Sequence, residues 1–355
     1  MTQTLHAFGG TSSIQQLQQL HPLQAPQHGG DLARAIQQFG GPADTWIDCS
    51  TGIAPQSYPL GDVPMSVWQS LPDRQDELLR TASLYYGCSA SHLLALAGSQ
   101  AAIQALPALR TRSRVGILAP SYAEHAWCWQ QHGHVVIGLE ADQIEAHLHH
   151  LDVLIVVNPN NPTGKQYPAA QLKQWHKQLQ RHDGWLIVDE AFADLDPQHS
   201  LMPDVGMGGL IVLRSVGKFF GLAGLRLGFA GLEGRLKHQL QRRLGLWSVS
   251  GIAEWVGPQI FVDQVWQDQQ RERIQMAHQW MSTTLKQVGL SNRSPHPMLH
   301  WCPHPRAFAL QRALAEQHIW CRLLEYPSAL RFGLIQPQQQ AKFLSGITQA
   351  MQSVA

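Results

Sequence analysis

Four short apolar runs in the middle of the chain have the pattern of strands buried on both faces of a sheet. They are rich in β-branched residues and do not alternate between apolar and polar positions; they cover residues 115–118, 153–157, 185–188 and 210–213. Continuous apolar runs of this length are typical of parallel strands that helices cover on both sides. We therefore predict a parallel sheet in this part of the chain.

Segments with helical spacing of apolar residues separate and flank these runs, at 76–86, 99–109, 169–181 and across most of 251–288. Alternation of strands and helices is the signature of an α/β layered domain. Toward the C-terminus, strand-like runs at 298–301, 319–323 and 330–334 alternate with helical segments at 306–316 and 338–353. This second pattern predicts a smaller α+β domain.

The two patterns divide the chain into three parts. Residues 1–55 contain turn signals and little periodicity, so we expect an N-terminal arm that packs on the smaller domain. Residues 56–250 would form the large domain and residues 251–355 the small C-terminal domain. A chain of 355 residues is long enough for two such domains.

Composition excludes several classes of function. Lys plus Arg number 26 and Asp plus Glu 25, so the net charge is +1, and charged residues make up only 14% of the chain. Neither nucleic acid nor a membrane is therefore an expected partner. The five cysteines form no C-x-x-C pair, and the first 15 residues lack the pattern of a signal peptide, so a cytoplasmic location is expected.

Common catalytic motifs are absent from the sequence. It contains no H-E-x-x-H and no G-x-S-x-G, and Gly217-Lys218 lacks the remaining residues of a P-loop. Apart from the adjacent pair His149-His150, the 19 histidines are spread singly along the chain. We therefore predict no metal site.

Polar residues follow three of the predicted strands. Asn161 lies in the segment after the strand at 153–157, Asp189 directly follows the strand at 185–188, and Lys218 comes shortly after the strand at 210–213. The carboxyl ends of parallel strands lie along one edge of the sheet, where open α/β proteins bind ligands. The pattern predicts that these three side chains meet in one crevice.

An amine, a carboxylate and an amide in one crevice are the groups that pyridoxal 5'-phosphate requires. Lys218 would bond to the aldehyde of the cofactor, Asp189 would keep its pyridine nitrogen protonated, and Asn161 would donate to its phenolate oxygen. Lys218 is one of only seven lysines in the chain. Further groups suit the phosphate and the ring: the bidentate guanidinium of Arg226, the hydroxyl of Ser215, the helix start at Gly98, Ser99 and Gln100, and the ring of Tyr122.

These segments and their spacing resemble the aminotransferase class I and II family, the pyridoxal-phosphate enzymes of fold type I. The gaps are 28 residues from Asn161 to Asp189, 29 from Asp189 to Lys218 and 8 from Lys218 to Arg226. The resemblance implies a mostly parallel central sheet with helices on both faces, plus a smaller α+β domain. It also implies a homodimer with Lys218 as the catalytic residue.

Within this family the chain resembles the threonine-phosphate decarboxylases, which are near relatives of the histidinol-phosphate aminotransferases. The resemblance lies in His28-Gly-Gly-Asp31 and in the segments 46–53, 71–73, 85–87 and 213–220. It implies decarboxylation of L-threonine O-3-phosphate to (R)-1-aminopropan-2-yl phosphate in cobalamin biosynthesis. By the same resemblance, Arg331 would receive the substrate carboxylate, and Arg322 and His28 would face the substrate phosphate.

Four positions depart from the pattern of the family: Phe192, Leu71, Gly217 and Ala54. Phe192 replaces a tyrosine of the aminotransferases and favours the decarboxylase branch, whereas Ala54 replaces an asparagine expected near the substrate phosphate. Two other functions therefore stay open on the sequence alone. One is an aminotransferase acting on histidinol phosphate or another amino acid, and the other is a catalytically silent protein that keeps the fold.

Overall fold

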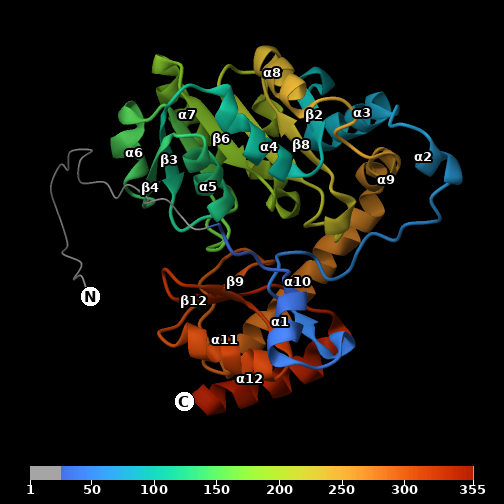
Figure 1. Ribbon diagram of the computed structural model, residues 1–355, viewed down its shortest axis with the longest axis vertical. Helices are drawn as coiled ribbons and strands as arrows, with labels where there is room; N and C mark the ends of the chain where they lie inside the picture. The colour runs from blue at the N-terminus through green and yellow to red at the C-terminus, as the bar shows by residue number, and fades with distance from the viewer. Residues whose placement is uncertain (1–24, 355) are drawn as a thin grey trace.

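The computed structural model describes residues 25–354 and contains a large domain built on a seven-stranded sheet (Figure 1). The strand order is β2-β8-β7-β6-β5-β3-β4. Strand β8 runs antiparallel to both of its neighbours, β2 and β7, and the other six strands run in one direction, which confirms a mostly parallel sheet. The strands are β2 (Leu93–Leu96), β3 (Arg114–Leu118), β4 (Val135–Leu139), β5 (Val153–Val157), β6 (Trp185–Asp189), β7 (Leu210–Ser215) and β8 (Gly228–Gly231).

Helices cover both faces of this sheet. Successive residues of a strand point to opposite faces, so neighbouring residues of one strand contact helices on opposite sides. Leu154 and Val156 of β5 belong to one hydrophobic cluster with Trp175 of α7, whereas Ile155 belongs to a second cluster with Trp129 of α5. The helices of the large domain are α2 (Met65–Gln69), α3 (Gln75–Tyr86), α4 (Ser99–Ala105), α5 (Ala123–Gln131), α6 (Ile144–His147), α7 (Ala169–Leu179) and α8 (Gly234–Leu244).

The second domain consists of an antiparallel sheet of order β11-β12-β9 packed with helices. Its elements are β9 (His300–Pro303), α11 (Ala307–Glu316), β10 (Ile319–Trp320), β11 (Arg322–Leu324), β12 (Ala329–Phe332) and α12 (Gln340–Val354). The predicted run at 319–323 is two strands, with the buried Cys321 between them. The order of strands and helices is that of an α+β domain.

The N-terminal segment lies against the second domain. Helix α1 (Leu32–Phe39) packs on α11, and strand β1 (Ile47–Asp48) pairs in parallel with β10. Trp46 also stacks on His318, with ring centroids 4.8 Å apart. The predicted arm includes residues 1–24, which lie outside the described residues.

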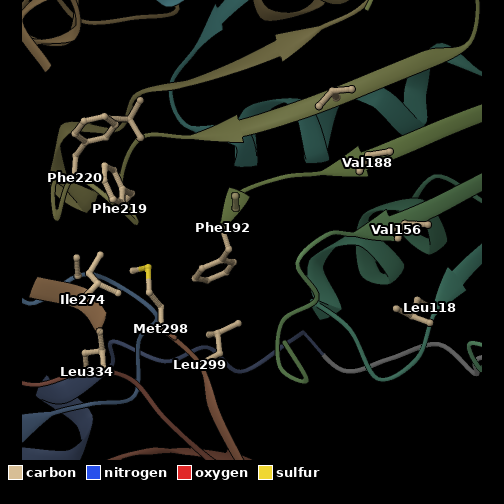
Figure 2. Packing of buried hydrophobic residues seen from close by; sticks show 14 of the residues in the cluster. Leu118, Val156, Val188, Phe192, Phe219, Phe220, Ile274, Met298, Leu299 and Leu334 are labelled. Carbon is tan, nitrogen blue, oxygen red and sulfur yellow. The ribbon is translucent and has the colours of Figure 1, made fainter. Parts of the chain in front are cut away.

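Two helices link the domains: α9 (Gly251–Val262), and α10 (Gln264–Gln287), which runs from the large domain to the small one (Figure 1). The hydrophobic core continues across the junction. Phe192, just beyond β6, points toward Leu299 of the small domain, and Ile274 of α10 lies near Met298 (Figure 2). Within residues 25–354, no helix combines the length and apolar character needed to cross a membrane.

Candidate active site

A cavity of about 440 Å³ lies at the carboxyl ends of β5, β6 and β7. It is lined by His28, Ser99, Gln100, Gln104, Tyr122, Glu124, Val157, Asn161, Asp189, Ala191, Phe192, Ser215, Lys218 and Arg226. A second cavity of about 200 Å³ shares His28 and Lys218 with the first and is also lined by Arg322 and Arg331. The structure thus brings the predicted site residues, except Gly98, from distant parts of the chain to the lining of two adjoining cavities.

Lys218 lies at the boundary between these two cavities. Removal of its ammonium group from water lowers the pKa of Lys218 to about 8, and the nearby positive charges of Arg331 and Arg226 act in the same direction. The negative charge of Asp189 opposes them. A much larger fraction of this amine is therefore neutral near pH 7 than in an ordinary lysine, and a neutral amine is the form that attacks a carbonyl carbon.

Asp189 ends strand β6 and is only 3% exposed. Its Oδ2 atom lies 2.9 Å from Nε2 of the buried His125, and its Oδ1 atom accepts a hydrogen bond from the backbone N–H of Ala191. His125 belongs to α5 and was not predicted as a site residue. Its position three residues after Tyr122, in the first turn of a helix, was the available signal.

The start of α4 and Arg226 form a narrow cradle beside the cavity. Gly98 has φ +76°, and a Cβ atom on it would lie 2.6 Å from Nη2 of Arg226. Arg226 itself has φ +54°. Gly228 of β8 lies so close that a Cβ atom there would be 2.5 Å from the backbone nitrogen of Ser99. Backbone N–H groups and a guanidinium at such close quarters suit a phosphate.

Ser215 points into this region because side chains alternate along β7. The preceding Arg214 points to the other side, where it is 2% exposed and bound to Glu190 at 3.0 Å and to Asp194 at 2.5 Å. Glu190 follows Asp189 directly and is fully buried in this ion network. Neighbouring residues thus have different roles: Ser215 and Asp189 line the cavity, whereas Arg214 and Glu190 belong to a buried ion network.

Arg331 and Asn161 contact each other at the second cavity. Arg331 donates from Nη1 to Oδ1 of Asn161 at 2.6 Å and from Nη2 to the carbonyl oxygen of Ser50. Its side chain is buried, which lowers the pKa of Arg331 to about 10, with the positive charge of Arg322 as a further cause. Within the described residues, Nε of Arg331 has no hydrogen-bond partner. A buried cation with an unused donor is suited to an anionic ligand.

His28 and Tyr122 lie where the two cavities meet. Nε2 of His28 is 2.6 Å from Oε1 of Glu124, and the ring centroids of His28 and Tyr122 are 5.8 Å apart. Burial and the charges of Glu124 and Asp189 raise the pKa of Tyr122, so its hydroxyl stays protonated and donates to Oε1 of Gln100. Glu124 and Gln104 are further lining residues that the sequence did not indicate.

The structure shows what surrounds each of the four positions that depart from the family pattern. A Cβ atom on Gly217 would lie 2.9 Å from the Cα atom of Ala223, so the loop leaves no space for a hydroxyl side chain there. Phe192 lines both cavities and packs edge-on against the ring of His296. Ala54 is buried, whereas Leu71 is 64% exposed.

The donor set of this site fits pyridoxal 5'-phosphate. The partly neutral amine of Lys218, the buried carboxylate of Asp189 and the cradle at Gly98 and Arg226 are the groups that its aldehyde, its ring nitrogen and its phosphate need. The glycine cradle is the most selective of these observations, since a single methyl group would collide with the arginine there.

Comparison with known proteins agrees with this fit. Residues 69–347 match the family model described as aminotransferase class I and II. The chain is 47% identical over 308 residues to threonine-phosphate decarboxylase of Pseudomonas aeruginosa. The aligned residues make up 87% of this chain and 92% of the relative. It is 38% identical over 313 residues to the enzyme of the same name from a Sinorhizobium species, with 86% and 92% covered.

Its fold is also similar to the crystal structure of histidinol-phosphate aminotransferase from Sinorhizobium meliloti in complex with pyridoxal-5'-phosphate. The TM-score is 0.78 at 17% identity, and 99% of both chains is covered. The family model matches most of this chain, and the 47% identity extends over 92% of the relative's length. The chain belongs to the aminotransferase class I and II family, whose enzymes use pyridoxal 5'-phosphate.

Proposed function

We propose that the protein decarboxylates L-threonine O-3-phosphate to (R)-1-aminopropan-2-yl phosphate, a step of cobalamin biosynthesis. The observation that carries this proposal is the 47% identity to a threonine-phosphate decarboxylase over 87% of the chain. The second cavity adds support because three basic residues line it: His28, Arg322 and Arg331. A phosphorylated amino acid carries two anionic groups that such residues can bind.

The first cavity would hold the cofactor. Pyridoxal 5'-phosphate, when bound, supplies an electron-poor ring that accepts the electron pair released when a bond at the α-carbon breaks. Lys218 would hold its aldehyde carbon, and Asp189 would bind its ring nitrogen. Gly98, Ser99, Gln100, Ser215 and Arg226 would hold its phosphate. Asn161 would donate to its phenolate oxygen, and Tyr122 would cover its ring.

The second cavity would hold the substrate. We place the substrate phosphate at Arg322 and His28 and its carboxylate at Arg331, whose Nε has no partner within the described residues. The carboxylate is released as CO2 when the bond to the α-carbon breaks. The vacated position on the α-carbon then needs a proton, and Nζ of Lys218 is the group at the cavity boundary that can deliver it.

An assay with L-threonine O-3-phosphate tests the proposal. We expect stoichiometric release of CO2 and aminopropanol phosphate without any 2-oxo acid. Lys218→Ala should abolish this activity, whereas Lys165→Ala, which changes an exposed lysine in the segment between β5 and α7, should not. Formation of glutamate from 2-oxoglutarate in place of CO2 would instead identify an aminotransferase.

The proposed assembly is a homodimer. Large apolar side chains are exposed on α2, α3 and α9 and on the segment before α9: Trp68 (59%), Leu84 (72%), Leu246 (80%) and Val262 (68%). Helices α2 and α3 both pack on α9, so these side chains lie on neighbouring elements. Exposed apolar residues on adjacent elements are typical of a surface that a second subunit covers.

A further inference from the structure

Glu124 is a buried acidic residue that joins two sides of the cavity. Glu124 is 8% exposed and lies in the first turn of α5. Oε1 lies 2.6 Å from Nε2 of His28, and Oε2 accepts a hydrogen bond from Nε2 of Gln100 at 2.7 Å. The thiol of Cys128 also points to Oε2, at 3.8 Å. The carboxylate is therefore held by donors from three directions.

A carboxylate is an unexpected neighbour for the ligands proposed above. Glu124 lines the cavity in which a phosphate is expected, and like charges placed close together repel each other. Its two shortest contacts are with the residues assigned to the two phosphates, Gln100 for the cofactor and His28 for the substrate. This arrangement indicates a role in holding those side chains rather than in contacting a ligand.

The backbone around His28 is attached to the opposite side of the site. Arg322 of β11 donates to the carbonyl oxygen of Gln27, and the N–H of Gly30 donates to Oγ of Ser50 at 2.7 Å. Both contacts connect residues 27–30 to segments at the second cavity. The side chain of His28 reaches from this segment to α5 of the large domain. Its contact with Glu124 thus connects the arm to the domain that would hold the cofactor.

We propose that Glu124 is a positioning residue for substrate binding: it holds the imidazole of His28 at the boundary of the two cavities, where the phosphate of the amino acid substrate would lie. This inference rests on the proposed function. The side chain of His28 is 43% exposed, so without Glu124 it is free to turn toward solvent. Loss of a preorganised contact weakens substrate binding before it affects the chemical step.

Steady-state kinetics of Glu124→Ala and Glu124→Gln test the proposal. For Glu124→Ala we expect KM for threonine phosphate to rise about tenfold, with kcat within about threefold of wild type. Glu124→Gln keeps an oxygen that can accept a hydrogen bond from His28, so its KM should lie between the KM of wild type and that of Glu124→Ala. In the His28→Ala background, Glu124→Ala should raise KM by less than twofold, since residues that act as a unit are not additive.

Glu145→Ala is the matched control, because Glu145 occupies the first turn of α6 and does not line either cavity. Its KM should equal that of wild type. An unchanged KM in Glu124→Ala, or additive effects in the double variant, would overturn the proposal. Glu124→Gln provides the test if the alanine variant does not fold.

Hydrogen exchange of the peptide covering residues 25–31 gives a readout that does not require turnover. The backbone N–H of Gly30 bonds to Ser50, so its exchange reports on detachment of the arm. We expect faster exchange in both His28→Ala and Glu124→Ala, and wild-type exchange in Glu145→Ala. Unchanged exchange in Glu124→Ala would contradict the proposal even if the enzyme acts on a different substrate. Absence of CO2 release by the wild type would refute only the proposed function.

Discussion

Single residues set the chemistry of this site through their neighbours. Lys218 and Asp189 line one cavity, yet each is controlled by a different partner. Burial and two arginines favour the neutral form of Lys218, whereas His125 binds Asp189 directly. The burial and charged neighbours of Lys218 thus favour a neutral amine beside a hydrogen-bonded carboxylate.

His125→Asn is predicted to lower kcat by about tenfold or more. The shorter side chain does not reach Oδ2 of Asp189, and a buried acceptor without its partner costs about 1–3 kcal/mol, and more when it is charged. The measurements are kcat and the affinity for pyridoxal 5'-phosphate, which should fall together. His176→Asn is the control, since His176 is also buried and bonds to the carbonyl oxygen of Gly208. A kcat within twofold of wild type would show that His125 does not support Asp189.

The lowered pKa of Lys218 predicts a pH dependence for cofactor capture. Only the neutral amine reacts, so the capture rate of the apoprotein should rise with pH and reach half its maximum near pH 8, well below the usual range for lysine. Arg331→Leu removes a positive charge that lowers this pKa, so its midpoint should move to higher pH. The measurement is the appearance of bound-cofactor absorbance after mixing. A midpoint above pH 10 would contradict the assigned environment.

At the scale of elements, the ends of strands and helices supply the site. The first turn of α5 contributes Glu124 and His125, and Tyr122 immediately precedes it. The turn between β2 and α4 contributes Gly98, whose positive φ directs the chain back toward Arg226. Two helix starts therefore provide four of the nine residues proposed to hold the cofactor: Gly98, Ser99, Gln100 and Tyr122.

Gly98→Ala is predicted to weaken affinity for pyridoxal 5'-phosphate by about tenfold or more while the protein still folds. The added methyl group would collide with the guanidinium of Arg226 and displace it from the cradle. Gly133→Ala is a close control: Gly133 has φ +79°, and a Cβ atom there meets nothing within 4 Å. Both glycines have positive φ, so both substitutions strain the backbone; Gly98, with ψ 158°, lies in a region open almost only to glycine, where a side chain costs about 1–3 kcal/mol. Equal cofactor affinity in the two would rule out the steric argument.

The sequence predicted four of the seven strands of the sheet, β3, β5, β6 and β7, because these are continuous apolar runs. It did not predict β2, β4 or β8; the four residues of β8, Gly228–Gly231, include two glycines and lack a strand-like pattern. It also did not single out His125 or Glu124. Their partners lie 64 and 96 residues away in the chain, and such contacts depend on how α5 is placed against the sheet and the arm. Motif residues at strand ends were predictable because parallel strands share one edge.

At the scale of the whole molecule, the site lies between parts that are distant in the sequence. The arm pairs with the small domain through β1 and β10, while Phe192 extends the core of the large domain toward Leu299 (Figure 2). The exposed apolar residues assigned to the dimer surface, Trp68, Leu84 and Val262, lie on other elements, α2, α3 and α9. A second subunit on those helices would therefore leave the packing between arm and small domain unchanged.

The proposed dimer predicts that sedimentation velocity will give a mass near twice the 39.5 kDa of one chain. Leu84→Glu combined with Val262→Glu should shift the protein toward the monomer, because charges replace apolar side chains that the partner would bury. Phe308→Glu, at an exposed position on α11, is the control and should leave the mass unchanged. A wild-type protein with the mass of one chain would contradict the dimer.

The strand order of the large sheet has a consequence for how the protein folds. Strand β2 pairs with β8, so Leu93 meets Gly231, and β8 in turn separates β2 from β7. Contacts between residues so far apart in the chain form slowly, since a long loop must close first. Gly98 follows β2 and Lys218 follows β7, so the cradle and the amine come together only after this pairing. Binding of the cofactor during refolding is therefore expected to report the pairing of β2 with β8.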